Sequence, residues 1–200
     1  MAHAGIVVHV DHRELMRTAI EHEGEGHRAA LRGDADAARA AYGRAVDAYR
    51  ASWEAAPPEA YGRLVGLLKA AVLASAPGEE AAYVRAAVSD EPASGSPTAA
   101  YALAVAALVA GDDHEAARWA GVMRAGSESF ARTAAAIESL ARGDRAGYRD
   151  AVTAIVRDFE GREEHLTGVA FSDTAAMLEA LAEPRGLAAR PSSRVLAPTV

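Results

Sequence analysis

A Gly-Asp step occurs three times in this chain, at Gly33-Asp34, Gly111-Asp112 and Gly143-Asp144. Each step stands between two segments in which apolar residues recur with the period of an α-helix. Because glycine and aspartate are frequent turn formers, each step predicts a tight turn between two helices. Three such turns predict helix hairpins stacked in series, and the expected fold class is therefore all-α, with stacked antiparallel hairpins.

About nine helices are expected along the chain. Asp11 is expected to cap the first of them, and Ser172 or Asp173 the last, which Pro184 ends. The expected helices span about 11–32, 36–55, 59–75, 79–88, 98–110, 113–125, 128–142, 145–160 and 173–183.

These helices are expected to form one domain over residues 1–200. Residues 89–97 are rich in turn formers and make either a long loop between hairpins or a boundary between two halves. Residues 1–10 are expected to lie as an extended arm against the first helix. The tail, 187–200, is expected either to dock on the body or to be loose.

The amino-acid composition limits the kinds of partner and the cellular compartment that we expect for this protein. The formal net charge of −7 argues against a nucleic-acid binder, which normally has a basic face, but it suits a basic protein partner. The absence of cysteine excludes disulfides and thiolate metal sites. The uncharged run 93–111 has too few apolar residues for a membrane span, and the N-terminus lacks the apolar core of a signal peptide. We therefore expect a cytoplasmic protein that binds neither nucleic acid nor membrane.

Small residues, a turn and an aromatic residue follow one another in the first hairpin: Gly26, Gly33, Asp34, Ala38, Tyr42 and Ala45. In this order they resemble the tetratricopeptide repeat, a helix pair of about 34 residues. Gly26 and Ala38 would let the two helices cross closely, and Tyr42 would fill the groove beside them. A partial second match lies within 103–116, whereas Glu25 departs from the pattern. The resemblance implies a superhelix of helix pairs with a concave inner face.

The C-terminal part carries a second pattern: Phe171-Ser172-Asp173-Thr174, then residues 177–182, Arg185-Gly186-Leu187 and Leu196-Ala197-Pro198. It resembles the ending of all-helical immunity proteins of bacterial polymorphic-toxin systems. Such proteins are small and acidic, and each binds and blocks a toxin. The resemblance implies a toxin, expected to be basic, as the partner.

Glu23 and His27 interrupt an otherwise apolar stripe of the first helix, where they stand one turn apart. In a tetratricopeptide-like hairpin this stripe faces the inner surface, where Tyr101 is also expected. We predict Glu23, His27 and Tyr101 as contacts for a partner or ligand; the alternative is a solvent-accessible surface pair. The carboxylate would raise the pKa of the imidazole beside it. His22 and His27 are five residues apart, which turns their rings to different faces and argues against a metal site.

No phosphate-binding loop and no nucleophile elbow occurs in the sequence, so we expect neither an enzyme nor a cofactor. The expected function is a protein–protein interaction module, in its sharper form an antitoxin-like immunity protein. The alternative is a small-molecule-binding or enzymatic helical domain that uses the inner face. A closed cavity lined by Glu23, His27 and Tyr101 would favour that alternative, and an inner face plugged by 187–200 would count against it. The third possibility is a homodimer formed through the apolar face.

Overall fold

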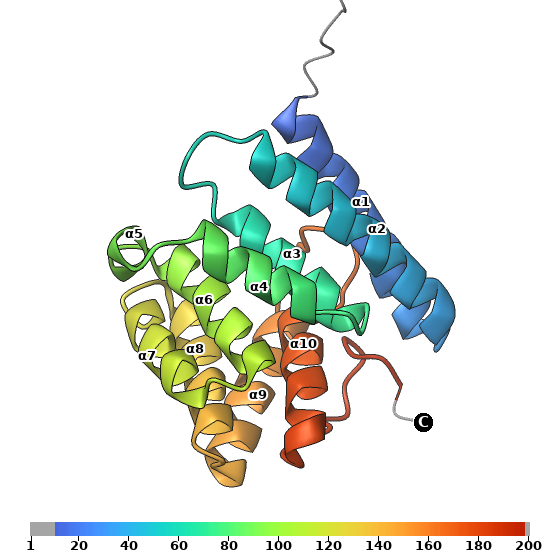
Figure 1. Cartoon of the computed structure of the whole chain (residues 1–200). Helices are drawn as coiled ribbons and strands as arrows, with labels where there is room; N and C mark the ends of the chain where they lie inside the picture. The colour runs from blue at the N-terminus through green and yellow to red at the C-terminus, as the bar shows by residue number, and fades with distance from the viewer. Residues whose placement is uncertain (1–10, 199–200) are drawn as a thin grey trace, which may run out of the picture.

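Ten α-helices and one short 3-10 helix make up the regular secondary structure of residues 11–198, which are the residues that this computed structural model describes (Figure 1). The all-α fold class is as predicted. The expected N-terminal arm, 1–10, lies outside the described residues. In chain order the helices are α1 (His12–Leu31), α2 (Ala35–Glu54), α3 (Gly62–Leu73), α4 (Gly78–Ala87), α5 (Asp90–Ser94), α6 (Pro97–Ala110), α7 (Asp113–Met123), α8 (Glu128–Ala141), α9 (Arg145–Glu160), α10 (Asp173–Ala182) and the 3-10 helix Glu183–Arg185.

The additional helix is α5, a single turn within the segment 89–97 that was expected to be a loop. Its Ala93 is fully buried, and α5 packs against α6. The start of α3 also differs from the expected residue 59. Glu59 has a positive φ of 66°, which is incompatible with a helix, so α3 begins three residues later, at Gly62.

The three Gly-Asp steps share one geometry. Gly33, Gly111 and Gly143 have φ values of 76°, 75° and 68°, the left-handed conformation that ends a helix. The aspartate that follows each glycine accepts a hydrogen bond from a backbone N–H in the first turn of the next helix. Two residues therefore end one helix and begin the next, which makes each hairpin tight.

Two glycines allow close approach between helices. A Cβ atom on Gly26 of α1 would lie 2.5 Å from the ring of Tyr42 on α2, and one on Gly66 of α3 would lie 2.5 Å from the ring of Tyr49. Both tyrosine rings are buried. The small-residue crossing expected at Gly26 is thus present, and a similar crossing at Gly66 joins the second hairpin to the first.

Consecutive helices pack on one another from α1 to α4 and from α6 to α9, and α3 and α4 both contact α6. The chain then returns, and α10 lies against α3, α8 and α9 (Figure 1). The apolar positions expected on the inner face, such as Leu68, Val105 and Ile137, are buried. α10 covers the part of this face that α3 and α8 provide, and the tail residues Leu187 and Val195 are buried in the same core.

The described tail, 187–198, packs beside α10. The backbone N–H groups of Ala189 and Arg190 donate to the Glu179 carboxylate at 3.1 and 2.5 Å, and the N–H of Ser172 donates to the Val195 carbonyl at 2.7 Å. Of the two expectations for the tail, docking on the body is the one observed for these residues. Within 11–198, no helix is both long enough and apolar enough to cross a membrane.

Candidate functional site

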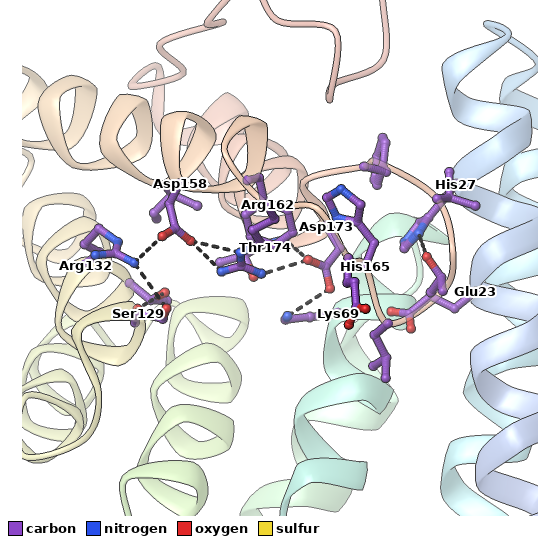
Figure 2. A pocket seen from close by; sticks show the side chains of 18 of the residues that line it. Glu23, His27, Lys69, Ser129, Arg132, Asp158, Arg162, His165, Asp173 and Thr174 are labelled. Carbon is purple, nitrogen blue, oxygen red and sulfur yellow. Dashed lines mark hydrogen bonds and ion pairs between the residues drawn. The ribbon is translucent and has the colours of Figure 1, made fainter.

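A pocket of about 270 Å³ lies where α1, α3, α6, α8, α9 and the start of α10 meet the connection 161–172 (Figure 2). Its buried end is formed by Glu23, His27, Lys69, Tyr101, Asp173 and Thr174. Its exposed rim is formed by Ser129, Arg132, Asp158, Arg162, Glu164 and His165. Its walls are mostly apolar and include Phe130, Thr133, Ile155, Phe159, Leu166, Thr167, Val169 and Phe171.

An ion pair occupies the buried end. The Lys69 ammonium lies 2.9 Å from the Asp173 carboxylate, and the two side chains are 15% and 17% exposed. Burial alone would lower the pKa of Lys69, but Asp173 outweighs it and holds that pKa above its usual value. Burial would likewise raise the pKa of Asp173, but Lys69 holds it below its usual value. Both groups are therefore charged at neutral pH.

Glu23 is buried beside this pair, 3% exposed. One carboxyl oxygen accepts a 2.9 Å hydrogen bond from the Tyr49 hydroxyl. Burial and then the charge of Asp173 raise the pKa of Glu23 to about 7, although Lys69 and Tyr49 act in the opposite direction. Glu23 is thus the titrating group of the buried end near neutral pH.

His27 is 2% exposed and stacks on Phe171, with ring centroids 4.6 Å apart. Its Nδ1 atom lies 3.1 Å from the Thr167 hydroxyl, while its buried Nε2 atom has no hydrogen-bond partner among residues 11–198. Burial lowers the pKa of His27 to about 4. The expectation that Glu23 raises this pKa is therefore wrong: desolvation of the imidazolium lowers it and outweighs the charge of Asp173, which acts in the opposite direction. The alternative of a solvent-accessible pair is wrong as well.

Tyr101 contributes a second unpaired polar atom. Its buried hydroxyl lies near Thr174 but makes no hydrogen bond of normal geometry within the described chain. Its ring packs edge-on against Phe130 at 6.0 Å, and the Lys69 Nζ atom lies 5.8 Å from the ring centroid. These contacts hold the ring in place beside the pocket.

The rim is organised around Asp158, which accepts hydrogen bonds from both Arg132 and Arg162 at 2.5–3.1 Å. Arg162 also lies over the Phe159 ring, on which His165 stacks. In Figure 2, Arg132 and Asp158 are on one side of the pocket and Glu23 and His27 on the other, with Lys69 and Asp173 between them. The connection 161–172 forms one wall of the pocket.

The three residues predicted for the site, Glu23, His27 and Tyr101, all border this one pocket. Sequence reasoning missed Lys69 and Asp173. Lys69 had a usable signal, because it is the only lysine in the chain and stands within the apolar run 64–73. Asp173 was considered only as a helix cap. The pocket is open at its rim, and no described tail residue lines it.

A second hollow, of about 380 Å³, lies between the α1–α2 hairpin and the docked tail. Its lining is mainly small or apolar, for example Ala38, Leu73 and Pro198, and includes the unpaired Tyr42 hydroxyl. No ion pair joins the described residues that line it. The pocket beside Glu23 is therefore the site with the richer chemistry.

In the described part of the chain no three His, Cys, Asp or Glu side chains are close enough together to hold a metal ion. The tetratricopeptide and immunity-protein resemblances rest on the residues quoted for them. No protein-family model, curated protein or solved structure matches this chain.

Proposed function

We propose that this protein binds a small organic molecule in the pocket between α1, α3, α8 and α10. The observation that carries the proposal is a pair of unpartnered buried polar atoms, His27 Nε2 and the Tyr101 hydroxyl, which belong to two residues lining a cavity beside the Lys69–Asp173 ion pair. A buried polar group without a partner costs about 1–3 kcal/mol, so such groups are rare where they have no role. A ligand would supply the missing hydrogen bonds.

The dimensions of the pocket limit the ligand. Ligand pockets usually measure about 300–1,000 Å³, and this one, at about 270 Å³, is just below that range. Apolar walls with a few converging polar groups are the usual construction of small-molecule sites. The proposal is therefore a compact metabolite and not a peptide.

We propose binding without catalysis. The Lys69 amine is held protonated by Asp173, which makes it a poor nucleophile. His27, with a pKa of about 4, is a weak base at neutral pH. Glu23 alone has a pKa suited to acid–base chemistry, and its hydrogen-bond partner is the buried Tyr49 hydroxyl, whose pKa burial holds above its usual value.

A protein-binding role is the second candidate, and one observation favours it. Leu166, on the connection at the rim, is 74% exposed and is the single large hydrophobic residue so exposed in 11–198. It follows Glu163, Glu164 and His165, an arrangement that would suit a basic partner. Two of the residues that carry the immunity-protein resemblance, Phe171 and Thr174, are instead buried. Protection from a toxin encoded beside the gene, lost in Leu166→Ser, would support this role; no protection would count against it.

The stack of helix hairpins supports a tetratricopeptide-like origin. In this chain α10 occupies much of the inner face, where a ligand would otherwise bind. The cytoplasmic location and the expected absence of nucleic-acid and membrane partners stay predictions.

A fragment screen by ligand-observed NMR tests small-molecule binding. Hits are expected to lose affinity several-fold in Tyr101→Phe, which removes the unpaired hydroxyl. Tyr83→Phe is the matched control, because its hydroxyl hydrogen-bonds to Glu54 on the surface away from the pocket. A screen without hits, or hits that both variants affect equally, would overturn the proposal.

A further inference from the structure

The buried end of the pocket holds two carboxyl groups and one ammonium. Lys69 is paired with Asp173, and in the described chain Glu23 has no ion-pair partner. An ionised Glu23 therefore gives this end a net charge of −1. A buried, uncompensated charge is costly, and a ligand of opposite charge would remove that cost.

The groups that surround Glu23 do not provide the missing cation. The titratable neighbours on the packed elements are His27 on α1, Tyr42 and Tyr49 on α2, Lys69 on α3, Tyr101 on α6 and Asp173 on α10. Lys69 is the one cation in this set, and Asp173 neutralises it. His27 is kept neutral by burial.

The hydrogen-bonding atoms fit an ammonium group. When His27 Nδ1–H donates to the Thr167 hydroxyl, the Nε2 atom becomes an acceptor. Tyr101 and Glu23 also line the pocket, and their hydroxyl and carboxyl groups are two further acceptors. An ammonium offers three N–H donors, which matches three acceptors, whereas a carboxylate would face Glu23 and Asp173. The aromatic walls, Phe130 and Phe159, suit an aromatic or apolar body.

We infer that the pocket takes a small primary amine in its protonated form, carried on an apolar or aromatic body. This inference rests on the proposed binding function and specifies the ligand class for the same site.

The inference has a consequence for pH. Glu23, with a pKa of about 7, holds a proton in much of the free protein at pH 6, and the bound ammonium takes the place of that proton. Because the ionised fraction of such a group rises about tenfold between pH 6 and pH 8, amine affinity is expected to rise about tenfold over the same interval. A neutral ligand has no such dependence on Glu23 ionisation.

Three probes with one common body separate the possible ligand classes: 3-phenylpropylamine, 3-phenylpropanol and 3-phenylpropionate. Isothermal titration of the full chain is expected to show tightest binding for the amine, with the tenfold rise from pH 6 to pH 8. Glu23→Gln keeps an acceptor for Tyr49 but cannot ionise. It is expected to lower amine affinity at pH 8 at least tenfold, to remove the pH dependence and to leave alcohol binding unchanged.

Glu80→Gln is the matched control, because Glu80 is also buried but pairs with Arg50 outside the pocket. It should not alter amine binding. Tightest binding of the alcohol or the carboxylate would overturn the amine inference and leave small-molecule binding intact. No binding of any probe would also overturn it, and the fragment screen then decides the broader function separately.

Discussion

At the scale of single residues, replacing Tyr101 tests whether its hydroxyl lowers the stability of the ligand-free protein. Because this buried hydroxyl has no hydrogen bond in the described chain, Tyr101→Phe should raise the free energy of unfolding of the ligand-free protein by about 1 kcal/mol. Tyr148→Phe should lower it by about 1 kcal/mol, since that hydroxyl donates to Glu179 at 2.6 Å. Urea denaturation measures both. If both substitutions lowered the free energy of unfolding equally, the conclusion that the Tyr101 hydroxyl lacks a hydrogen-bond partner would be contradicted.

Glu23 and His27 should have opposing effects on stability as pH changes. Glu23 has its pKa raised from 4.5 to about 7, so its contribution to stability is present at low pH and is lost as the pH rises towards 7. His27 has its pKa lowered from 6.5 to about 4, so its contribution is present above pH 6.5 and is lost as the pH falls towards 4. Between pH 5 and 6.5 the two contributions nearly cancel.

Replacing either Glu23 or His27 should reveal the pH dependence of stability that the other residue contributes. In Glu23→Gln the free energy of unfolding should rise by up to about 2 kcal/mol from pH 5 to 6.5, because His27 then titrates alone. In His27→Phe it should fall over the same interval. Since the measured quantity is the slope against pH, any constant cost of either substitution does not interfere. If the free energy of unfolding depended on pH in both variants as it does in the wild type, these two groups would not be buried as described.

At the scale of helices, two glycines in the first hairpin should respond oppositely to the same substitution. Gly26→Ala would place a methyl group 2.5 Å from the Tyr42 ring and should lower the free energy of unfolding by about 2 kcal/mol. Gly43 lies within α2, and open space surrounds the position that an added methyl group would take there. Gly43→Ala should therefore raise the free energy of unfolding by about 1 kcal/mol through helix propensity. Thermal and urea unfolding test the pair, and equal effects would argue against a close crossing at Gly26.

The helices could be predicted because their ends are determined locally. Each Gly-Asp step contains both the residue that ends a helix and the residue that caps the next, and the Asp11 side chain accepts from the Arg13 N–H as a cap should. The start of α3 was wrong because a positive φ at Glu59 has no sequence signal. The helix α5 was missed because five residues are too few for a recognisable period.

The pocket could be predicted only in part, because it depends on the whole molecule. The stripe on α1 indicated the face that Glu23 and His27 share, and their burial depends on α10 and the connection 161–172, more than 130 residues away. The partner of Lys69 is equally remote in sequence, 104 residues further along. Local periodicity carries no information about such contacts. Hence the predicted residues do lie together, while the alternative of a solvent-accessible Glu23–His27 pair and the expected pKa of His27 were wrong.

At the scale of the whole molecule, α10 determines whether the apolar inner face is available to a second copy. Met177 and Leu178 of α10 are fully buried, and Leu166 is the exposed large hydrophobic residue of the described chain. A stable dimer normally needs a larger apolar patch. We therefore expect a monomer of 20.7 kDa in light scattering after size-exclusion chromatography. Leu178→Asp should detach α10 and produce larger species, whereas Leu166→Asp, at the exposed position, should leave the mass unchanged. A wild-type dimer that Leu166→Asp dissociates would instead identify the rim as an interface between copies.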